Sequence, residues 1–271
     1  MSKYSISTDL EKLIAIIKQK PRLLMMLDYD GTLVPIQAKP DLARPSGELL
    51  DLLNKLAFCE GIRLAIISGR DLLDLKGLLP VESIYLVGGH GAAIEGPDER
   101  RYDIINPGKL QPVLEQLVLI AKQCVGKASG FIIETKTTSL ALHYRLADPA
   151  RVRPVLTAFV TKSFPWLKPY ALELLHGKKV IEVRSRLINK GKAVEYLLGL
   201  SPGYYPVFLG DDRTDEDAFA VLQGKGIGVL IAPEDRTTRA ALRLESPEKV
   251  QKLLRYLFKT HCEVLKSGTS F

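Results

Sequence analysis

Cysteine is scarce in this chain, with three residues among 271, at positions 59, 124 and 262. The count is odd, the spacings are wide and no Cys-x-x-Cys pair occurs. Such a pattern predicts neither a disulfide framework nor a zinc site. We therefore expect Cys59, Cys124 and Cys262 to be free thiols, packed as small side chains in the core or at the surface.

Long apolar runs are missing as well. No segment approaches the roughly 18 apolar residues that a membrane-spanning helix needs, and residues 1–7 lack the apolar stretch of a signal peptide. Hydrophobic residues make up 46% of the chain and charged residues 25%, as is typical of a globular protein with a substantial core. We expect a cytoplasmic protein without a membrane partner, and 271 residues predict about two domains.

Dense basic stretches are also absent, although the formal net charge is +7. Lysine and arginine are scattered along the chain, so the sequence does not favour a nucleic-acid partner. A site for an anionic small molecule explains part of the excess charge equally well. We expect a monomer that acts on a small-molecule substrate.

The chain instead has short apolar runs that alternate with helical patterns. Apolar residues recur at helical spacing in 10–17 and 49–56. Because strands with apolar interiors alternate with helices, the sequence predicts an α/β fold with a doubly wound, Rossmann-like parallel sheet. The strand-like runs are residues 23–27, 64–67, 84–87, 207–209 and 227–231.

The middle of the chain has a different pattern, in which each of two helical stretches is followed by two strand-like runs. The first two of these runs read as a hairpin across Thr137 and Thr138. Paired strands favour an α+β insert that is separate from the parallel core. We expect a core made of residues 1–100 and 186–271, with an inserted α+β cap domain at 101–185.

Polar residues follow several of the predicted core strands. Asp28 and Asp30 follow the first, Ser68 the second, and Asp211 and Asp212 the fourth. The carboxyl ends of parallel strands share one edge of the sheet, where α/β proteins bind ligands. One aspartate there is commonly a turn former, but the whole set favours a site. Repulsion between neighbouring carboxylates favours a bound cation, and carboxylate oxygens suit Mg²⁺.

Two further groups bear on this site. Residues 210–217 are dense in acid, and Thr214 and Asp217 have the spacing of a capping box, so part of the segment is expected to begin a helix. Asp211 follows the strand directly and is the better metal ligand. Lys190 comes at the beginning of a predicted helix, where a bound phosphate would offset its unfavourable charge. The alternative is a lysine exposed to solvent.

These residues, in this order, resemble the four motifs of the haloacid dehalogenase superfamily of phosphatases. The segment Asp28-Tyr-Asp-Gly-Thr32 is similar to the first motif, Ser68 to the second and Lys190 to the third. Gly210-Asp211-Asp212 with Asp215 is similar to the fourth. The resemblance implies the fold of that superfamily, with a cap inserted into the core.

A closer resemblance is to the trehalose-6-phosphate phosphatase family, from about residue 23 to residue 231. Ser185 stands where the family usually has proline, and residues 92–94 match less well. The segments that carry the resemblance are Asp28-Tyr-Asp-Gly-Thr-Leu-Val-Pro-Ile36, Glu134-Thr-Lys136, Ser139-Leu-Ala-Leu-His-Tyr-Arg145, Gly177-Lys-Lys-Val-Ile-Glu-Val-Arg184, Asn189-Lys-Gly-Lys192 and Gly210-Asp-Asp-Arg-Thr-Asp-Glu-Asp-Ala-Phe219.

This resemblance implies a Mg²⁺-dependent phosphatase of trehalose biosynthesis that releases trehalose and phosphate. It implies that Asp28 is the nucleophile and forms an aspartyl-phosphate. It implies that Asp30 is the general acid and base, and that Ser68 and Lys190 hold the phosphoryl oxygens. The implied metal ligands are Asp28, Asp30 through its backbone carbonyl, and Asp211, with Asp212 and Asp215 orienting the metal site and Lys190.

The insert is implied to be a lid that recognises the sugar and excludes water. Glu134 and Lys136 are two residues apart and so lie on one face of a strand. The alternative for these residues is the ordinary polar face of a sheet, and the alternative for His143 is a packed histidine. The residues expected to bind substrate are Arg70, His90, Glu134, Lys136, His143, Arg145, Lys178 and Glu182.

Two other functions are open at this point. A related phosphatase or phosphomutase acting on another sugar phosphate would carry the same motifs. A catalytically silent regulatory or binding domain would be expected to have lost Asp28, Asp30 or Asp211, and all three are present.

Overall fold

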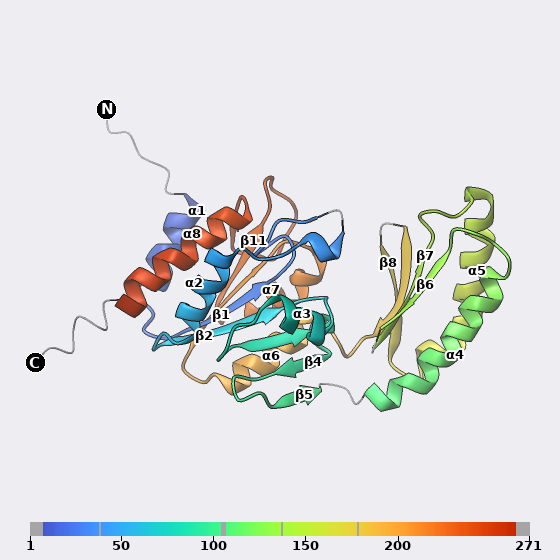
Figure 1. Ribbon diagram of the computed structural model, residues 1–271, viewed down its shortest axis with the longest axis horizontal. Coiled ribbons are helices and arrows are strands. Elements are labelled where there is room, and N and C mark those ends of the chain that lie inside the picture. The colour runs from blue at the N-terminus through green and yellow to red at the C-terminus, as the bar shows by residue number, and fades with distance from the viewer. Residues whose placement is uncertain (1–7, 38, 104–106, 137, 178, 264–271) are drawn as a thin grey trace, which may run out of the picture. The chain divides into compact units, whose positions relative to one another are not determined.

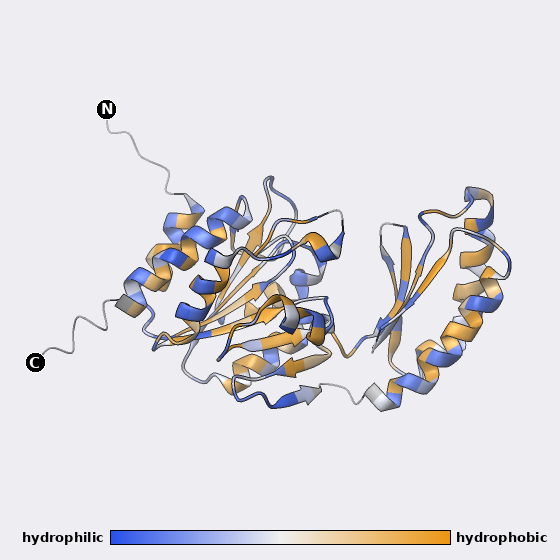
Figure 2. Ribbon diagram, viewed as in Figure 1, coloured by the Kyte–Doolittle hydropathy of each residue, from blue (hydrophilic) through white to orange (hydrophobic). Residues whose placement is uncertain are grey.

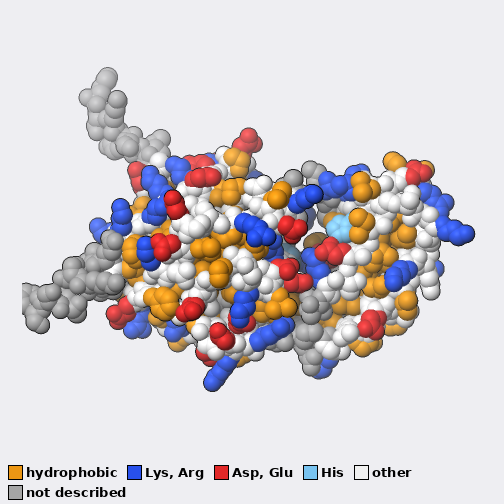
Figure 3. Space-filling view, viewed as in Figure 1, with side chains coloured by type: hydrophobic (Ala, Val, Ile, Leu, Met, Phe, Trp, Pro, Cys, Tyr) orange, Lys and Arg blue, Asp and Glu red, His pale blue; other side chains and the backbone are white. Residues whose placement is uncertain are grey.

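The structure is a computed structural model that describes residues 8–37, 39–103, 107–136, 138–177 and 179–263. It divides into two compact units, one formed by Met1–Tyr102 with Asn189–Phe271 and the other by Asp103–Ile188 (Figure 1). Within the described ranges, no helix has the length and apolar character needed to cross a membrane. Basic and acidic side chains are interspersed on the face shown in Figure 3.

The first unit is built on an eight-stranded sheet in the order β12-β11-β10-β1-β2-β3-β4-β5. β1 pairs in parallel with both β2 and β10, whereas β4 is antiparallel to β3. The strands are β1 Leu23–Asp28, β2 Ile62–Ile67, β3 Tyr85–Gly88, β4 Ala93–Glu95, β5 Arg101–Asp103, β10 Tyr205–Gly210, β11 Ile227–Ile231 and β12 Leu242–Leu244.

Helices cover both faces of this sheet. α1, α2, α3 and α8 share one apolar cluster with the strands, and α1, α2 and α8 lie together in Figure 1. On the other face, Phe219 of α7 packs edge-on against Phe208 of β10. All of β1 is buried, as expected for a central parallel strand. The helices are α1 Asp9–Ile17, α2 Gly47–Ala57, α3 Leu72–Leu78, α6 Lys190–Leu200, α7 Glu216–Leu222 and α8 Pro247–Leu257, with short helical turns at η1 Pro40–Leu42, η2 Gly89–Gly91, η3 Arg213–Asp215 and η4 Phe258–Glu263.

The second unit is a four-stranded antiparallel sheet with two long helices. Its strands follow the order β6-β7-β9-β8, with bounds β6 Ile132–Thr135, β7 Ser139–His143, β8 Leu172–Gly177 and β9 Val180–Ser185. Helices α4 (Pro107–Val125) and α5 (Pro149–Leu167) share an apolar cluster with one face of the sheet. These strands carry both hydrophobic and hydrophilic residues (Figure 2), and burial alternates along β9, which indicates one packed and one polar face.

The predicted fold class is confirmed: a doubly wound, largely parallel α/β core is interrupted by an α+β unit. The antiparallel β4 and the edge strands β5 and β12 were not predicted, because each has only three residues. Runs this short leave almost no periodic signal.

The prediction that Cys59 and Cys262 are free thiols is wrong, because the two are joined by a disulfide across 203 residues. Cys59 follows α2 and Cys262 lies in η4, and the fold brings their Cα atoms to 5.2 Å. Wide spacing in the sequence hides this proximity. Cys124 is a free thiol.

Candidate active site

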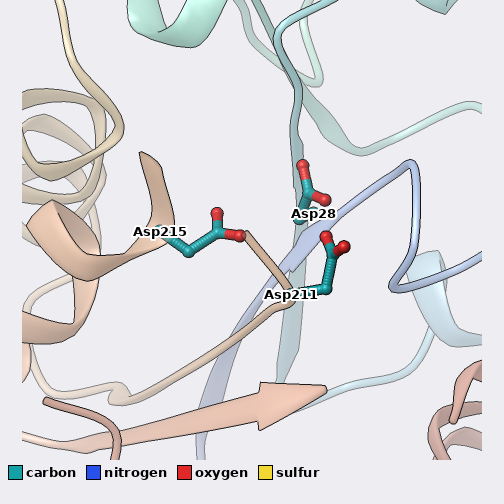
Figure 4. Close-up of side chains that lie close together, drawn as sticks. All are labelled: Asp28, Asp211 and Asp215. Atoms are coloured by element: carbon teal, nitrogen blue, oxygen red, sulfur yellow. The ribbon is translucent and has the colours of Figure 1, made fainter. Parts of the chain in front are cut away.

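Two aspartates meet at the carboxyl edge of the core sheet. Asp28 is the last residue of β1, and Asp211 follows β10, which pairs with β1 in parallel. Their carboxylates point toward each other, and that of Asp215 in η3 lies beside them (Figure 4). One oxygen from each of the three lies within 4.8 Å of the others. Parallel pairing thus joins residues that are far apart in the sequence.

Gly31 allows the first motif to turn directly beneath this cluster. Its backbone has a φ of 83°, which favours glycine, and a Cβ at this position would collide with the carboxylate of Asp211. The turn is closed by a hydrogen bond from the Gly31 N–H to the carbonyl of Val34. The chain can therefore reverse here without displacing Asp211.

Lys190 is buried among these acids. It is the first residue of α6, whose N-cap Asn189 accepts a hydrogen bond from the N–H of Lys192. The Lys190 side chain is 2% exposed, and its Nζ donates to Asp28 Oδ1 and Asp215 Oδ1, each at 2.6 Å. The alternative of a solvent-exposed lysine is thereby excluded.

The acids near Lys190 share an unfavourable environment. Burial raises the pKa of Asp28 and of Asp211 to about 7, and that of Asp215 to about 8. Burial would by itself lower the pKa of Lys190, but the charges of Asp28 and Asp215 outweigh it and raise that pKa. Burial would likewise raise the pKa of Asp212, but Lys190 and hydrogen bonds from Thr214 leave it lowered. A divalent cation would relieve the repulsion that remains between the carboxylates.

The free oxygens of the cluster fit a metal ion at Asp28 and Asp211. Asp211 Oδ1 is buried and has no hydrogen-bond partner among the described residues. Asp215 is less available, because one of its oxygens accepts from Lys190 and the other from the N–H of Asp212. Hard oxygen donors of this kind suit Mg²⁺ or a similar cation. The described residues thus include an acidic cluster capable of holding a metal.

In the acid-rich segment 210–217, the residue that caps the first helical turn differs from the predicted one. Asp212, not Thr214, forms the capping box: it accepts from the N–H of Thr214 and of Asp215, while Asp215 accepts from the N–H of Asp212. The prediction that Thr214 pairs with Asp217 is therefore wrong. A short η3 turn precedes α7, and this moves the cap two residues toward the N-terminus.

Backbone hydrogen bonds connect the turn after β2 with the turn after β3. Ser68 is buried, its hydroxyl accepts a hydrogen bond from the N–H of Arg70, and its carbonyl accepts one from the N–H of His90. The imidazole of His90 occupies the space that a side chain at Gly69 would need. His90 has a φ of 58°, and its charge helps to lower the pKa of Asp212. Ser68, Arg70 and His90 thus belong to the same edge of the sheet.

Arg70 is paired with Asp30. Its Nε and Nη2 donate to the two carboxylate oxygens of Asp30, each at 2.7 Å. This pairing explains why the side chain of Asp30 is not part of the three-acid cluster, although the sequence places it two residues after Asp28. Asp30 remains among the predicted metal ligands through its backbone carbonyl alone.

Sequence reasoning missed two residues that support this edge. Arg236 donates through Nη2 to the carbonyls of Asp211 and Asp212, at 3.2 and 3.0 Å. Tyr29 is fully buried, and its hydroxyl donates to the carbonyl of Ala43 at 2.8 Å. The position of Tyr29 inside the first motif was a usable signal. Arg236 lies in an irregular segment after β11 and offered none.

In the second unit, four of the expected substrate-binding residues lie on or beside the face of the sheet opposite the apolar cluster, here called the open face: Glu134, Lys136, His143 and Glu182. Pairing places Ala141 between Glu134 and Glu182 in one row. Glu134 accepts a hydrogen bond from His143 at 2.8 Å and lies 4.0 Å from the Nζ of Lys136. Arg145 is exposed in the turn after β7, and Lys178 lies outside the described residues.

Comparisons with known proteins identify the family. The profile named Trehalose-phosphatase matches residues 26–248. Trehalose-phosphate phosphatase B of Arabidopsis thaliana is 35% identical over 253 residues, which are 87% of this chain and 66% of that relative's length. The C-terminal domain of a C. albicans trehalose-6-phosphate phosphatase aligns with a TM-score of 0.76 at 28% identity, over 94% of this chain and 99% of that one.

The fold is also found in a haloacid dehalogenase-like hydrolase from Bacteroides thetaiotaomicron, at a TM-score of 0.62 and 15% identity, over 87% of this chain and 99% of that one. The family match extends over both units of the structure. The predicted family and the predicted enzyme class are confirmed. This chain belongs to the trehalose-phosphatase family, a family of phosphoric monoester hydrolases.

Proposed function

We propose that this protein is a Mg²⁺-dependent phosphatase that hydrolyses trehalose 6-phosphate to trehalose and phosphate. The observation that carries the proposal is the buried contact of Lys190 with Asp28, beside the unpartnered oxygen of Asp211. This arrangement offers a nucleophile, a cation for phosphoryl oxygens and a metal ligand at one edge of the sheet. Membership of the trehalose-phosphatase family supports the choice of substrate.

The metal would be held by carboxylate oxygens of Asp28 and Asp211 and by the backbone carbonyl of Asp30. When bound, Mg²⁺ supplies positive charge that neutralises the phosphoryl oxygens and the adjacent carboxylates. Asp212 and Asp215 contribute by holding the η3 turn and Lys190 in place. These two residues therefore orient the site without direct contact with the reacting atoms.

The reaction has two steps. A carboxylate oxygen of Asp28 attacks phosphorus, the bond from phosphorus to the sugar oxygen breaks, and that oxygen takes a proton from Asp30. Water then attacks the phosphorus of the aspartyl-phosphate and gives its proton to Asp30. The bond from phosphorus to Asp28 breaks, so both carboxyl groups return to their initial state. Trehalose 6-phosphate and water are consumed, and trehalose and phosphate are released.

Ser68 and Lys190 are proposed to bind the phosphoryl oxygens. Lys190 is a donor with a fixed position, because two carboxylates hold its ammonium group. Preorganised positive charge of this kind is the main source of catalysis in phosphoryl transfer. Ser68 is held by its own turn, so its hydroxyl needs little reorganisation.

The open face of the second unit is proposed to recognise the sugar. Glu134 and Glu182 flank Ala141, whose methyl group leaves room between the two carboxylates. His143 and Lys136 lie next to Glu134. Sugars present many hydroxyl donors and acceptors, for which charged side chains make strong directional partners. Arg145 and Lys178 remain proposed contributors to the same recognition, and Arg70 and His90 belong to the core edge.

The test is phosphate release from trehalose 6-phosphate and from glucose 6-phosphate, with Mg²⁺ and with EDTA. We expect release from trehalose 6-phosphate to be faster and to depend on Mg²⁺. Asp28→Asn should reduce turnover by about a thousandfold or more, whereas Asp51→Asn, the same change at an exposed residue of α2, should leave it unchanged. Equal rates for the two sugars would refute the substrate, and an active Asp28→Asn would refute the nucleophile.

A further inference from the structure

Asp30 is engaged at both of its carboxylate oxygens. The Nε of Arg70 donates to Oδ2 and the Nη2 donates to Oδ1, each at 2.7 Å. Two parallel N–H···O bonds of this kind are the strongest and most directional pairing available to a carboxylate. The Arg70 side chain is only 12% exposed, whereas that of Asp30 is 38% exposed. The arginine is therefore the better buried of the two partners.

Arg70 is in turn fixed by its surroundings. Its guanidinium lies over the ring of Tyr29, 5.2 Å from the ring centroid, and Tyr29 is fully buried. The backbone of Arg70 is held at both ends, since its N–H donates to Ser68 Oγ and its carbonyl accepts from the N–H of Gly89. Asp30 thus faces a donor pair whose position is set by the core of the first unit.

The two steps of the proposed reaction make opposite demands on Asp30. In the first it must donate a proton to the leaving oxygen, and in the second it must accept one from water. In the observed position the guanidinium of Arg70 occupies one lone pair of each carboxylate oxygen of Asp30. The pairing therefore fixes the orientation of this carboxylate, and the second step needs Asp30 as an oriented acceptor.

We propose that Arg70 is a positioning residue that acts through Asp30 in the second step, the hydrolysis of the aspartyl-phosphate. It orients the carboxylate that takes the proton from the attacking water, and it does not itself bind the substrate. This inference rests on the proposed function, because it assumes the aspartyl-phosphate. It also departs from the expectation that Arg70 contacts the substrate.

The two roles of Arg70 predict different kinetics. If Arg70 supports only the second step, its loss makes hydrolysis of the aspartyl-phosphate slower and rate-limiting. Both kcat and KM then fall by the same factor, while kcat/KM, which reports the first step, is kept. If Arg70 binds substrate, KM rises and kcat/KM falls. A structural role would lower activity without this paired decrease.

The experiment compares Arg70→Met and Arg70→Lys with the wild type on p-nitrophenyl phosphate and trehalose 6-phosphate in Mg²⁺ buffer. For Arg70→Met we expect kcat to fall by about tenfold or more, with kcat/KM within about threefold of the wild type. Rapid mixing should show a burst of p-nitrophenolate followed by a slower steady state. Arg70→Lys should be intermediate, because lysine can hold one carboxylate oxygen but not both.

Two controls keep the result interpretable. Arg63→Met removes an arginine within β2, which donates to the carbonyl of Leu200 and stacks on Tyr204, and it should leave the kinetics unchanged. In an Asp30→Asn background, Arg70→Met should cause no further loss of kcat. A raised KM in Arg70→Met, or an additive loss in the double variant, would overturn the inference. Absence of any wild-type phosphatase activity would instead refute the proposed function.

Discussion

Replacing Lys190 by methionine removes the positive charge from the centre of the site. Lys190 is 2% exposed, and its two partners, Asp28 and Asp215, are 6% and 0% exposed. The variant would leave two carboxylates buried without their cation. Removing one partner from a buried ion pair costs about 3–5 kcal/mol of unfolding free energy, and we expect Lys190→Met to fall in this range at pH 7.

The cost should depend on pH in a defined direction. Burial already raises the pKa of Asp28 to about 7 and that of Asp215 to about 8, from an ordinary value of 3.8. Without Lys190 both would rise further, so the folded variant would bind protons that the unfolded chain releases above about pH 4. Stability then falls as pH rises. The deficit of Lys190→Met relative to the wild type should be smaller at pH 5 than at pH 8.

The difference in unfolding free energy between Lys190→Met and the wild type can be measured at pH 5 and pH 8 by urea unfolding followed by circular dichroism, without added metal. Lys190→Met/Asp215→Asn, in which one of the stranded charges is neutralised, should recover about 1–3 kcal/mol. Lys192→Met is the matched control on the same helix: the side chain of Lys192 is 52% exposed and its ammonium pairs with Glu195, so the change should stay within about 0.5 kcal/mol. A Lys190→Met protein as stable as the wild type, or a double variant less stable than the single one, would refute the reasoning.

Three further predictions concern the sugar face, the disulfide and the metal. Glu134→Gln should raise KM for trehalose 6-phosphate about tenfold, as expected for the loss of a charged hydrogen-bond partner. It should leave KM for p-nitrophenyl phosphate nearly unchanged. An equal increase in KM for both substrates would show that Glu134 does not recognise the sugar. Cys59→Ser opens a loop of 203 residues and should lower the unfolding free energy by about 3–5 kcal/mol in non-reducing buffer. Adding a reductant should lower the unfolding free energy of the wild type to that of the variant. If the wild type and the variant were equally stable in non-reducing buffer, the pairing of Cys59 with Cys262 would be contradicted. Because burial raises the pKa of Asp28 and Asp211 to about 7, the metal-free protein should lose stability as pH rises from about 4 to 7. Mg²⁺ should therefore raise the melting temperature more at pH 8 than at pH 5, and an equal rise at both would argue against these two carboxylates as the site.

Local pattern was sufficient for most secondary structure. The apolar run at 23–27 became β1, and the helical spacing of 10–17 became α1, because a buried strand and an amphipathic helix each have a period visible in a short window. The antiparallel insert was visible as strand-like runs, of which 139–145 and 179–184 became β7 and β9. The gathering of Asp28 and Asp211 followed from parallel pairing alone, which brings carboxyl ends to one edge.

The sequence by itself therefore determined most of the elements, the fold class, the family and the meeting of Asp28 and Asp211 at the edge of the sheet. Only the tertiary structure decided what each side chain touches. It placed Lys190 between two buried acids, turned Asp30 toward Arg70, and joined Cys59 to Cys262. The physical reason is separation along the chain. Strand and helix periods depend on residues that are close in the sequence, whereas ion pairs, unpartnered buried oxygens and disulfides depend on distant residues that only packing brings together.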